Sequence, residues 1–349
     1  MKIFIKNTEL YPQKEIYTMK KYNVAVVGAT GMVGRKMLQV LAERNLPIDN
    51  LYLFASARSA GNKVEFMGKE YTVIELTEEN VLARKIDIAL FSAGGSTSKA
   101  FAPVFANNGT LVIDNSSQWR TDPNVPLVVP EVNSHDIDWH NNIIANPNCS
   151  TIQAVVALAP LHRKYGIKRI VYSTYQAVSG AGMGGFADLE NGVKGEAPKK
   201  FPKPIFGNVI PHIDVFLPNG YTKEEEKMMF ETRKILGDPD LKITATTVRV
   251  PVYYGHSESI NIEFKNPITL EGVKECLRNA DGVILSEEAE VYHTPLDTAN
   301  TNPVYVSRVR LDNSVENGLN LWVVADNIRK GAATNAVQIA EKVIAKDNK

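Results

Sequence analysis

Apolar and polar positions in the first part of the chain follow the order of a strand, a helix and a second strand. Residues 23–34, NVAVVGATGMVG, form an apolar run that ends in a glycine turn. Residues 35–45 then place apolar side chains at helical spacing, and the apolar run at 51–56 is typical of a second buried strand. The pattern predicts a βαβ unit.

The same alternation continues further along the chain. Strand-like runs at residues 86–93 and 110–117 enclose a helical stretch at 98–108. Because strand–helix–strand connections favour parallel strands with one handedness, this order predicts a Rossmann-type, doubly wound sheet in an α/β domain. We expect that domain to end near residue 148.

After Cys149 long β-rich runs dominate the pattern. They lie at residues 169–180, 241–255, 259–265 and 304–312, with few helical segments between them. Such runs are typical of a mostly antiparallel sheet, and they predict an α+β second domain.

Two further segments complete the prediction. Residues 180–220 are rich in Gly and Pro and too long for a plain connector, so we expect this loop to cover a site or a subunit interface. Residues 331–346 have the apolar spacing of a helix that packs against a sheet.

Composition narrows the class of partner. The chain has 349 residues, 44% of them hydrophobic, which suffices for two domains. Lys plus Arg and Asp plus Glu number 39 each, so no excess of charge attracts nucleic acid or an anionic membrane, and we expect a small-molecule partner. No run is long and apolar enough to span a bilayer. Residues 1–18 lack a signal-peptide core and are expected to be a flexible extension.

Cysteine and histidine usage excludes two kinds of scaffold. Two cysteines, Cys149 and Cys276, are too few for a disulfide framework or a four-thiolate zinc site, and the six histidines show no close metal-ligand pairing. We therefore expect no metal and a reducing, cytoplasmic setting.

The glycine turn is a candidate cofactor site. Gly28, Gly31 and Gly34 stand between a strand and a helix, the context of a dinucleotide-binding turn, although GxxGxxG departs from the commoner GxGxxG. Glycine permits close backbone approach, and the amides at the helix start face the pyrophosphate. The alternative is a glycine turn that binds nothing.

The turn after the second strand bears on the choice of cofactor. It reads SARS, residues 56–59, with no acid for a ribose 2′-hydroxyl. Ser56, Arg58 and Ser59 suit a 2′-phosphate instead, which favours NADP; a solvated turn is the alternative.

Cys149 is the candidate nucleophile. It precedes a predicted helix, whose N-terminus stabilises a thiolate and lowers the thiol pKa. A buried apolar cysteine is the alternative, and Cys276 fits that description well. His256 follows a strand, where bases are often presented, but Arg249 lies seven residues earlier and spacing alone does not pair the two.

Eight motifs occur together and in order along the chain. They are GATGMVG, SARSAG, SAGGSTSK, DNSSQWR, NPNCST, YQAVSGAG, RVPVYYGHSES and ADNIRKGAA. From about residue 22 to the C-terminus, this ordered set resembles the aspartate-β-semialdehyde dehydrogenase family. The resemblance implies a glyceraldehyde-3-phosphate-dehydrogenase-like architecture and a homodimer, with a homotetramer as the alternative.

The reaction implied by the resemblance interconverts L-aspartyl 4-phosphate and L-aspartate 4-semialdehyde with NADPH, in the biosynthesis of lysine, threonine and methionine. Cys149 would form a thioester with release of phosphate, and His256 would act as acid and base. Gln176 would orient the intermediate; a polar residue on a strand face is its alternative.

Substrate contacts are implied in the same way. Arg249 would hold the substrate α-carboxylate, and Glu224 the α-amino group. Lys227 would bind phosphate with Arg120 and Asn148. From the residues alone, Glu224 and Lys227 are equally typical of a solvated helix face, and the neighbouring Glu225 and Glu226 leave the glutamate assignment open.

The implied cofactor contacts come from the glycine turn, the turns that follow strands, and two later loops. They are Gly28, Ala29, Thr30, Gly31, Met32, Val33, Gly34, Ser56, Arg58, Ser59, Ser92, Ala93, Gly94, Gly95, Ser179, Gly180 and Asn327.

The implied domains are an NADP-binding domain at 19–148, rejoined by a helix at 331–349, and a catalytic and dimerisation domain at 149–330. A rival is N-acetyl-γ-glutamyl-phosphate reductase, whose capped substrate has no ammonium for Glu224. A remote alternative, a non-catalytic NADP-binding sensor, has no need of Cys149, Gln176 and His256.

Overall fold

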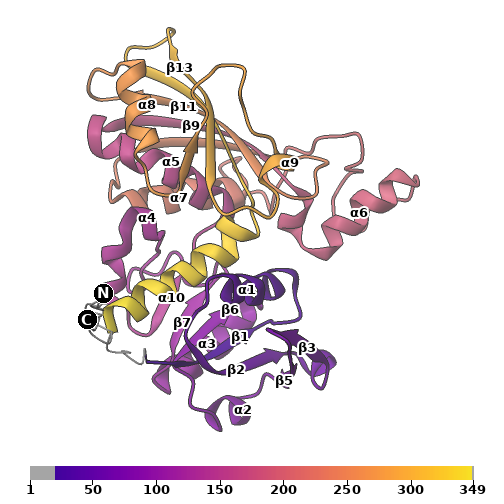
Figure 1. The fold of residues 1–349 in the computed structure, drawn as a ribbon. Coiled ribbons are helices and arrows are strands. Elements are labelled where there is room, and N and C mark those ends of the chain that lie inside the picture. The colour runs from indigo at the N-terminus through magenta and orange to yellow at the C-terminus, as the bar shows by residue number, and fades with distance from the viewer. Residues whose placement is uncertain (1–19, 348–349) are drawn as a thin grey trace, which may run out of the picture.

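The structure is a computed structural model that describes residues 20–347, so the extension expected at 1–18 lies outside the described residues. Figure 1 shows one lobe built on β1, β2, β6 and β7 and another built on β9, β11 and β13. Each lobe holds one six-stranded sheet.

The first sheet is parallel throughout, in the order β5-β2-β1-β6-β7-β8. Its strands are β1 (Tyr22–Val27), β2 (Ile48–Ala55), β5 (Ile74–Glu75), β6 (Ile88–Phe91), β7 (Leu111–Asp114) and β8 (Ile143–Ala145). Chain order runs outward in both directions from β1 and β6, which confirms the doubly wound prediction. Ligands bind such sheets at the carboxyl edge where the order reverses, here between β1 and β6.

Helices and a hairpin cover this sheet. They are α1 (Met32–Glu43), α2 (Glu78–Leu82), α3 (Gly95–Asn107), a short 3-10 turn (Ala57–Ser59) and the hairpin of β3 (Lys63–Phe66) and β4 (Lys69–Thr72). The last helix, α10 (Thr334–Asp347), also packs here, since Ala336, Val337 and Ile339 share a core with Val24 and Leu90. Figure 1 shows α10 running beside this lobe.

The second sheet is mixed, in the order β10-β9-β11-β14-β13-β12. Its strands are β9 (Ile167–Gln176), β10 (Lys242–Arg249), β11 (His256–Phe264), β12 (Val283–Leu285), β13 (Val304–Asp312) and β14 (Gly318–Ala325). The three central pairs are antiparallel, as expected, and the two outer pairs are parallel. The parallel pair β9–β10 is possible because a long crossover with two helices separates these strands.

Three helices lie with this sheet: α5 (Cys149–Tyr165), α7 (Lys223–Leu236) and α8 (Leu270–Arg278). Most of α5 is buried, because its apolar residues pack among those of β9, β11, β13 and β14. The helix that begins at Cys149 is therefore a central element of the second domain's core.

The segment 180–220 contains a helix, where the sequence predicted an irregular loop. It contains α6 (Met183–Val193), preceded by a 3-10 turn (Val178–Ala181). Leu189 of α6 packs with Ile205 and Ile210 in a small core of its own, and this packing offsets the poor helix propensity of the glycines in α6. Figure 1 shows α6 projecting from the body of the lobe.

The remaining elements are short. They are α4 (Pro130–Asn133), a 3-10 turn (Ser134–Trp139), α9 (Pro295–Thr298) and a π-helical turn (Arg329–Ala333) that leads into α10. Within residues 20–347, no helix is long and apolar enough to cross a membrane.

Candidate active site

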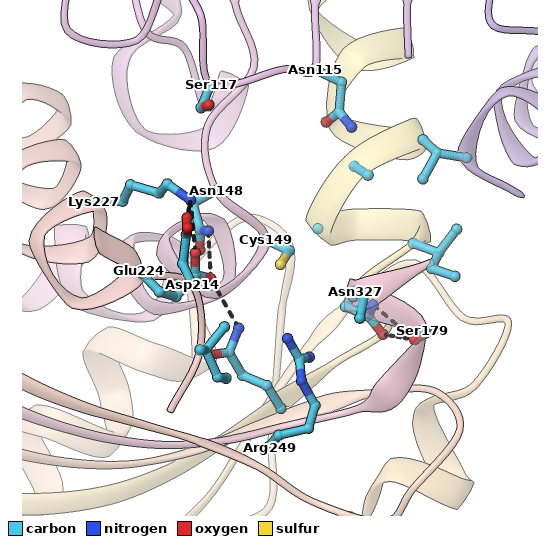
Figure 2. A pocket seen from close by; sticks show the side chains of 18 of the residues that line it. Asn115, Ser117, Asn148, Cys149, Ser179, Asp214, Glu224, Lys227, Arg249 and Asn327 are labelled. Carbon is cyan, nitrogen blue, oxygen red and sulfur yellow. Dashed lines mark hydrogen bonds and ion pairs between the residues drawn. The ribbon is translucent and has the colours of Figure 1, made fainter. Parts of the chain in front are cut away.

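A cavity of about 600 Å³ is lined by residues from both lobes and from the π-helical turn. It brings together the predicted catalytic and substrate-binding residues except His256, and four of the predicted cofactor residues. These are Val33, Arg120, Asn148, Cys149, Gln176, Ser179, Gly180, Glu224, Lys227, Arg249 and Asn327. In Figure 2 the Cys149 thiol lies between the Glu224 and Lys227 side chains on one side and the Ser179–Asn327 pair on the other.

Cys149 is the first residue of α5, one position inside the helix that the sequence predicted to follow it. Asn148 caps the helix, its Oδ1 accepting hydrogen bonds from the backbone N–H groups of Ser150 at 2.9 Å and Thr151 at 3.3 Å. Gly331 of the π-helical turn packs against the cysteine; a methyl group there would lie 2.9 Å from the Cys149 Cβ. The backbone and Cβ of Cys149 are thus fixed from two sides.

The backbone N–H of Ser150, at the start of α5, lowers the pKa of Cys149 in the expected direction, but larger effects raise it overall. Burial raises the pKa of the thiol to about 12, and the Glu224 carboxylate raises it further, while Arg120 and Arg249 oppose the shift. Loss of hydration outweighs the helix dipole here. The resting residue is a thiol that needs a proton acceptor when it reacts.

His256 begins β11 and is fully buried. Its Nδ1 accepts a hydrogen bond from the backbone N–H of Ala177 at 3.0 Å, so the neutral ring carries its proton on Nε2. Nε2 has no hydrogen-bond partner among the described residues. Burial lowers the pKa of His256 to about 3, Arg249 adds to this and Glu224 opposes it.

Arg249 ends β10 and lies close to His256, a proximity that sequence spacing did not establish. A methyl group on Gly180 would meet the Arg249 Nη1 at 2.9 Å and the His256 Nε2 at 3.3 Å. Nη1 donates to the carbonyl of Ala177 at 2.6 Å, and the guanidinium lies 5.7 Å from the centre of the Phe201 ring. No carboxylate among residues 20–347 forms an ion pair with this buried cation. It is therefore suited to an anionic ligand.

Glu224 is buried and faces the cavity rather than solvent. Its Oε1 accepts hydrogen bonds from Asn148 Nδ2 at 2.8 Å and from Gln176 Nε2 at 3.1 Å, and its Oε2 lies 3.1 Å from Lys227 Nζ. Burial by itself would raise the pKa of Glu224, but Lys227 and these hydrogen bonds lower it to about 2. A carboxylate of this kind can bind an ammonium group.

The neighbouring glutamates have other partners. Glu225 closes a capping box with Thr222 at the start of α7, and Glu226 accepts a hydrogen bond from Asn219. Of the three consecutive glutamates, Glu224 is the one that lines the cavity.

Lys227 has a second carboxylate partner that the sequence reasoning missed. Its Nζ lies 2.7 Å from Asp214 Oδ2, on the segment that follows α6. Lys200, Phe201 and His212 of the same segment also line the cavity. The sequence pointed to this segment as a whole, because residues 180–220 were expected to cover a site. Nothing in the sequence distinguished these individual residues.

Glu231 was also missed, although it organises the predicted anion-binding residues. Its Oε1 lies 3.1 Å from Arg120 Nη1, and its Oε2 accepts the backbone N–H of Asn148 at 2.6 Å. Glu231 lies seven residues after Glu224 on α7, so it shares that helix face. This spacing could have indicated from the sequence that Glu231 lies on the same side of α7 as Glu224.

The glycine turn lies at the switch point of the first sheet. Gly28 has φ +84°, and a methyl group there would lie 2.4 Å from the carbonyl oxygen of Ser92 at the end of β6. At Gly34 it would lie 2.2 Å from the carbonyl oxygen of Gly28. These close approaches bring the start of α1 to the carboxyl edge of β1 and β6, where a dinucleotide pyrophosphate fits.

The other predicted cofactor residues lie on either side of this turn. Thr30 Oγ1 is 3.5 Å from Ser59 Oγ, which joins the glycine turn to the turn with Ser56 and Arg58, both exposed. Towards the cavity, Ser179 Oγ accepts a hydrogen bond from Asn327 Nδ2 at 3.0 Å. Among the described residues, no group of three or more His, Cys, Asp or Glu side chains is placed to hold a metal ion.

Comparison with known proteins agrees with this architecture. A family model described as semialdehyde dehydrogenase, NAD binding domain, matches residues 23–140, and one described as semialdehyde dehydrogenase, dimerisation domain, matches residues 158–330. The fold and the site therefore define a two-domain semialdehyde dehydrogenase that uses a nicotinamide dinucleotide and has a domain of an oligomerising type.

Individual relatives narrow the family. The aspartate-semialdehyde dehydrogenase of Aquifex aeolicus is 58% identical over 334 residues, which cover 93% of this chain and 98% of that protein. A crystal structure of aspartate semialdehyde dehydrogenase II from Vibrio cholerae, complexed with ASA, has a TM-score of 0.90 at 48% identity and covers 93% of this chain and 99% of that one. A Candida albicans aspartate semialdehyde dehydrogenase with NADP has a TM-score of 0.75 at 26% identity, covering 94% and 99%. The chain belongs to the aspartate-semialdehyde dehydrogenase family.

Proposed function

We propose that this chain interconverts L-aspartyl 4-phosphate and L-aspartate 4-semialdehyde with NADPH, as a step in the biosynthesis of lysine, threonine and methionine. The observation that carries the proposal is the placing of two opposite charges, on Arg249 and Glu224, in one cavity with Cys149. An α-amino acid presents a carboxylate and an ammonium group, and these two side chains complement them.

The covalent step takes place on Cys149. Its sulfur attacks the acyl carbon, the bond from that carbon to the phosphate oxygen breaks, and phosphate leaves with the bonding electrons, so that a thioester remains. When bound, NADPH supplies the hydride that reduces the thioester. Collapse of the resulting thiohemiacetal releases the aldehyde and restores the cysteine.

His256 manages the protons of these steps. In the tautomer selected by the Ala177 N–H, Nε2–H donates a proton or a hydrogen bond to an oxygen on the substrate. Taking the thiol proton at Nε2 requires the other neutral tautomer, in which an Nδ1–H faces the Ala177 N–H. We therefore assign His256 mainly to the substrate oxygen, and the thiol proton passes to a phosphate oxygen of the bound acyl phosphate, so that the leaving group departs as hydrogen phosphate.

Other side chains bind and orient the substrate. Gln176 orients the covalent intermediate, Arg249 holds the α-carboxylate and Glu224 the α-ammonium group. Arg120, Lys227 and Asn148 bind phosphate, which requires Lys227 to exchange its contact with Asp214 for the anion.

The finer cofactor assignment is NADP. Its support is the turn of Ser56, Arg58 and Ser59, which offers a cation and two hydroxyls and no acid at the end of β2. The glycine turn 28–34 and residues 92–95 would hold the pyrophosphate and ribose, and Ser179, Gly180 and Asn327 the nicotinamide end.

We also propose a homodimer, with a tetramer as the larger alternative, formed through the open face of the second sheet. Tyr175 and Ile284 expose apolar surface there, and Tyr292 lines a hollow with Tyr175 on the same face, which supports such an interface. The domain limits 19–148, 149–330 and 331–349, and a cytoplasmic location, remain predictions.

The activity is tested by phosphate-dependent reduction of NADP+ with aspartate semialdehyde. We expect turnover in the wild type and none in Cys149→Ala, with circular dichroism and the NADP+ affinity retained. Full activity of Cys149→Ala contradicts the covalent step. A strong preference for N-acetylglutamate semialdehyde in the same assay contradicts the substrate assignment.

A further inference from the structure

The carboxyl group of Glu258 is buried near the active site and has no part in the reaction described above. Glu258 lies on β11 two positions after His256, so both side chains point to the same face of the sheet. It is 0% exposed, and neither of its carboxyl oxygens has a hydrogen-bond partner among the described residues. A buried, unpaired carboxylate is very costly, which raises the question of its protonation state.

Gln153 supplies a complementary unpaired atom. Its Nε2 donates to the backbone carbonyl of His256 at 3.1 Å, whereas its Oε1 is buried and has no donor among residues 20–347. Gln153 lies on α5, one turn after Cys149, and its side chain is close enough to Glu258 to lower the pKa of that carboxyl group, against the larger effect of burial. Two neighbouring acceptors are both satisfied if one of them carries a proton.

The surrounding elements provide no cation to offset a charge on Glu258. From β9 the neighbouring titratable group is Tyr172, whose pKa is raised by burial although a hydrogen bond with Thr232 opposes the rise. On β11 it is His256, whose low pKa keeps it neutral. The residue opposite Glu258 on β14 is Val323, and α5 contributes the neutral Gln153. Burial accordingly raises the pKa of Glu258 well above its ordinary value.

Glu258 is also adjacent to the supports of both His256 and Gln176. Its partner in register on β9 is Thr174, whose Oγ1 donates to Gln176 Oε1 at 3.3 Å. On the helix side, Gln153 bonds to His256. The carboxyl group thus lies beneath two residues assigned to catalysis without lining the cavity.

We propose that Glu258 is a positioning residue, held as the neutral acid, whose hydroxyl donates to Gln153 Oε1 and so fixes the Gln153 amide on the His256 carbonyl. Its effect on turnover rests on the proposed function, but the protonation and the hydrogen bond are properties of the folded chain.

The protonation state is measured by infrared difference spectroscopy between the full-length wild type and Glu258→Gln at neutral pH. We expect a carbonyl stretching band of a protonated carboxylic acid in the wild type that Glu258→Gln lacks. A carboxylate band in its place would overturn the proposal, whatever reaction the enzyme catalyses.

The positioning role is measured by steady-state kinetics. Glu258→Gln has the same shape and can donate to Gln153 Oε1 through its amide, so we expect kcat, KM and the pH profile to stay within about twofold of wild type. Glu258→Leu leaves Gln153 Oε1 unpaired, and we expect kcat to fall about tenfold with little change in KM. Ile260→Val, on the same face of β11, is the control for lost packing and should leave kcat unchanged.

Two outcomes contradict the positioning role: an unchanged kcat in Glu258→Leu, or an equal loss in Glu258→Gln. If Glu258→Leu does not fold, Gln153→Leu removes the same hydrogen bond from the helix side and should lower kcat alike. Failure of the proposed function itself would appear as a wild type without semialdehyde activity, while the infrared band remained.

Discussion

Glu231 accepts a hydrogen bond from the backbone N–H of Asn148 at 2.6 Å, and Asn148 is the residue that caps the helix of Cys149. The other oxygen of the same carboxylate lies 3.1 Å from Arg120. One buried acid therefore fixes both the start of the nucleophile's helix and a predicted phosphate ligand.

Removing this acid should cost both stability and substrate binding. We expect Glu231→Ala to lower the free energy of unfolding by about 3–5 kcal/mol, because it leaves Arg120 as an unpaired buried cation. Urea denaturation measures the change. Glu263→Ala, which removes a partly exposed partner of Lys168, is the control and should cost no more than about 1 kcal/mol. Equal losses of unfolding free energy in the two variants would show that the buried ion pair contributes no more to stability than the exposed one.

The contact between Gly331 and Cys149 leads to a kinetic prediction. A methyl group at Gly331 would lie 2.9 Å from the Cys149 Cβ, so Gly331→Ala has to displace the nucleophile or the π-helical turn. We expect kcat to fall by about 100-fold, as misplacement by about 1 Å can do. Gly184→Ala, whose methyl group would meet only the flexible Lys200 side chain at 3.4 Å, is the matched control. Normal turnover in Gly331→Ala would mean that the turn yields without moving the thiol.

The raised pKa of Cys149 predicts how the thiol responds to pH. Because its pKa is about 12, the thiolate fraction should rise about tenfold per pH unit through neutral and mildly alkaline solution. We expect the rate of iodoacetamide labelling to follow it without a plateau, with Cys149→Ala giving the background from Cys276. Glu224→Gln should accelerate labelling at fixed pH, since the carboxylate raises the thiol pKa. A plateau near neutral pH would restore the lowered pKa expected from the helix N-terminus.

The same shift bears on stability. The thiol binds its proton more tightly in the folded chain than in the unfolded chain. Its contribution to the free energy of unfolding is therefore fully present below the ordinary thiol pKa. That contribution is lost as the pH rises toward about 12.

Cofactor choice is tested at Arg58. We expect Arg58→Ala to raise the KM for NADPH by about 10- to 100-fold, which corresponds to one lost charge-assisted contact, and to leave the KM for NADH unchanged. Lys69→Ala, an exposed cation of the β3–β4 hairpin, is the control. An equal rise in the KM for NADPH and for NADH would show that Arg58 does not bind the 2′-phosphate.

Much of the fold was predictable because local patterns determine it. The run from Asn23 to Gly34 specifies a strand, a tight turn and a helix by itself, and the alternation that follows allows few topologies other than a doubly wound sheet. The outer strand pairs of the second sheet were less predictable, because the direction of β10 and β12 depends on long connections rather than on their own residues.

The residues of the site also divide into those that the sequence predicted and those that it did not. Cys149, His256, Gln176, Arg249 and Glu224 were nominated by motifs, and the structure brings them to one place. Glu231, Asp214 and Glu258 were not, because a charged residue in a sequence shows neither its burial nor its partner.

The sequence by itself determined the order of the elements, the helix that begins at Cys149 and the glycine turn, since each depends on neighbours within a few residues. Only the tertiary structure decided that burial raises the pKa of the Cys149 thiol, that Glu224 rather than Glu225 or Glu226 faces the cavity, and that His256 lies close to Arg249. These depend on desolvation and on charges from distant segments, and both exist only once the chain has folded.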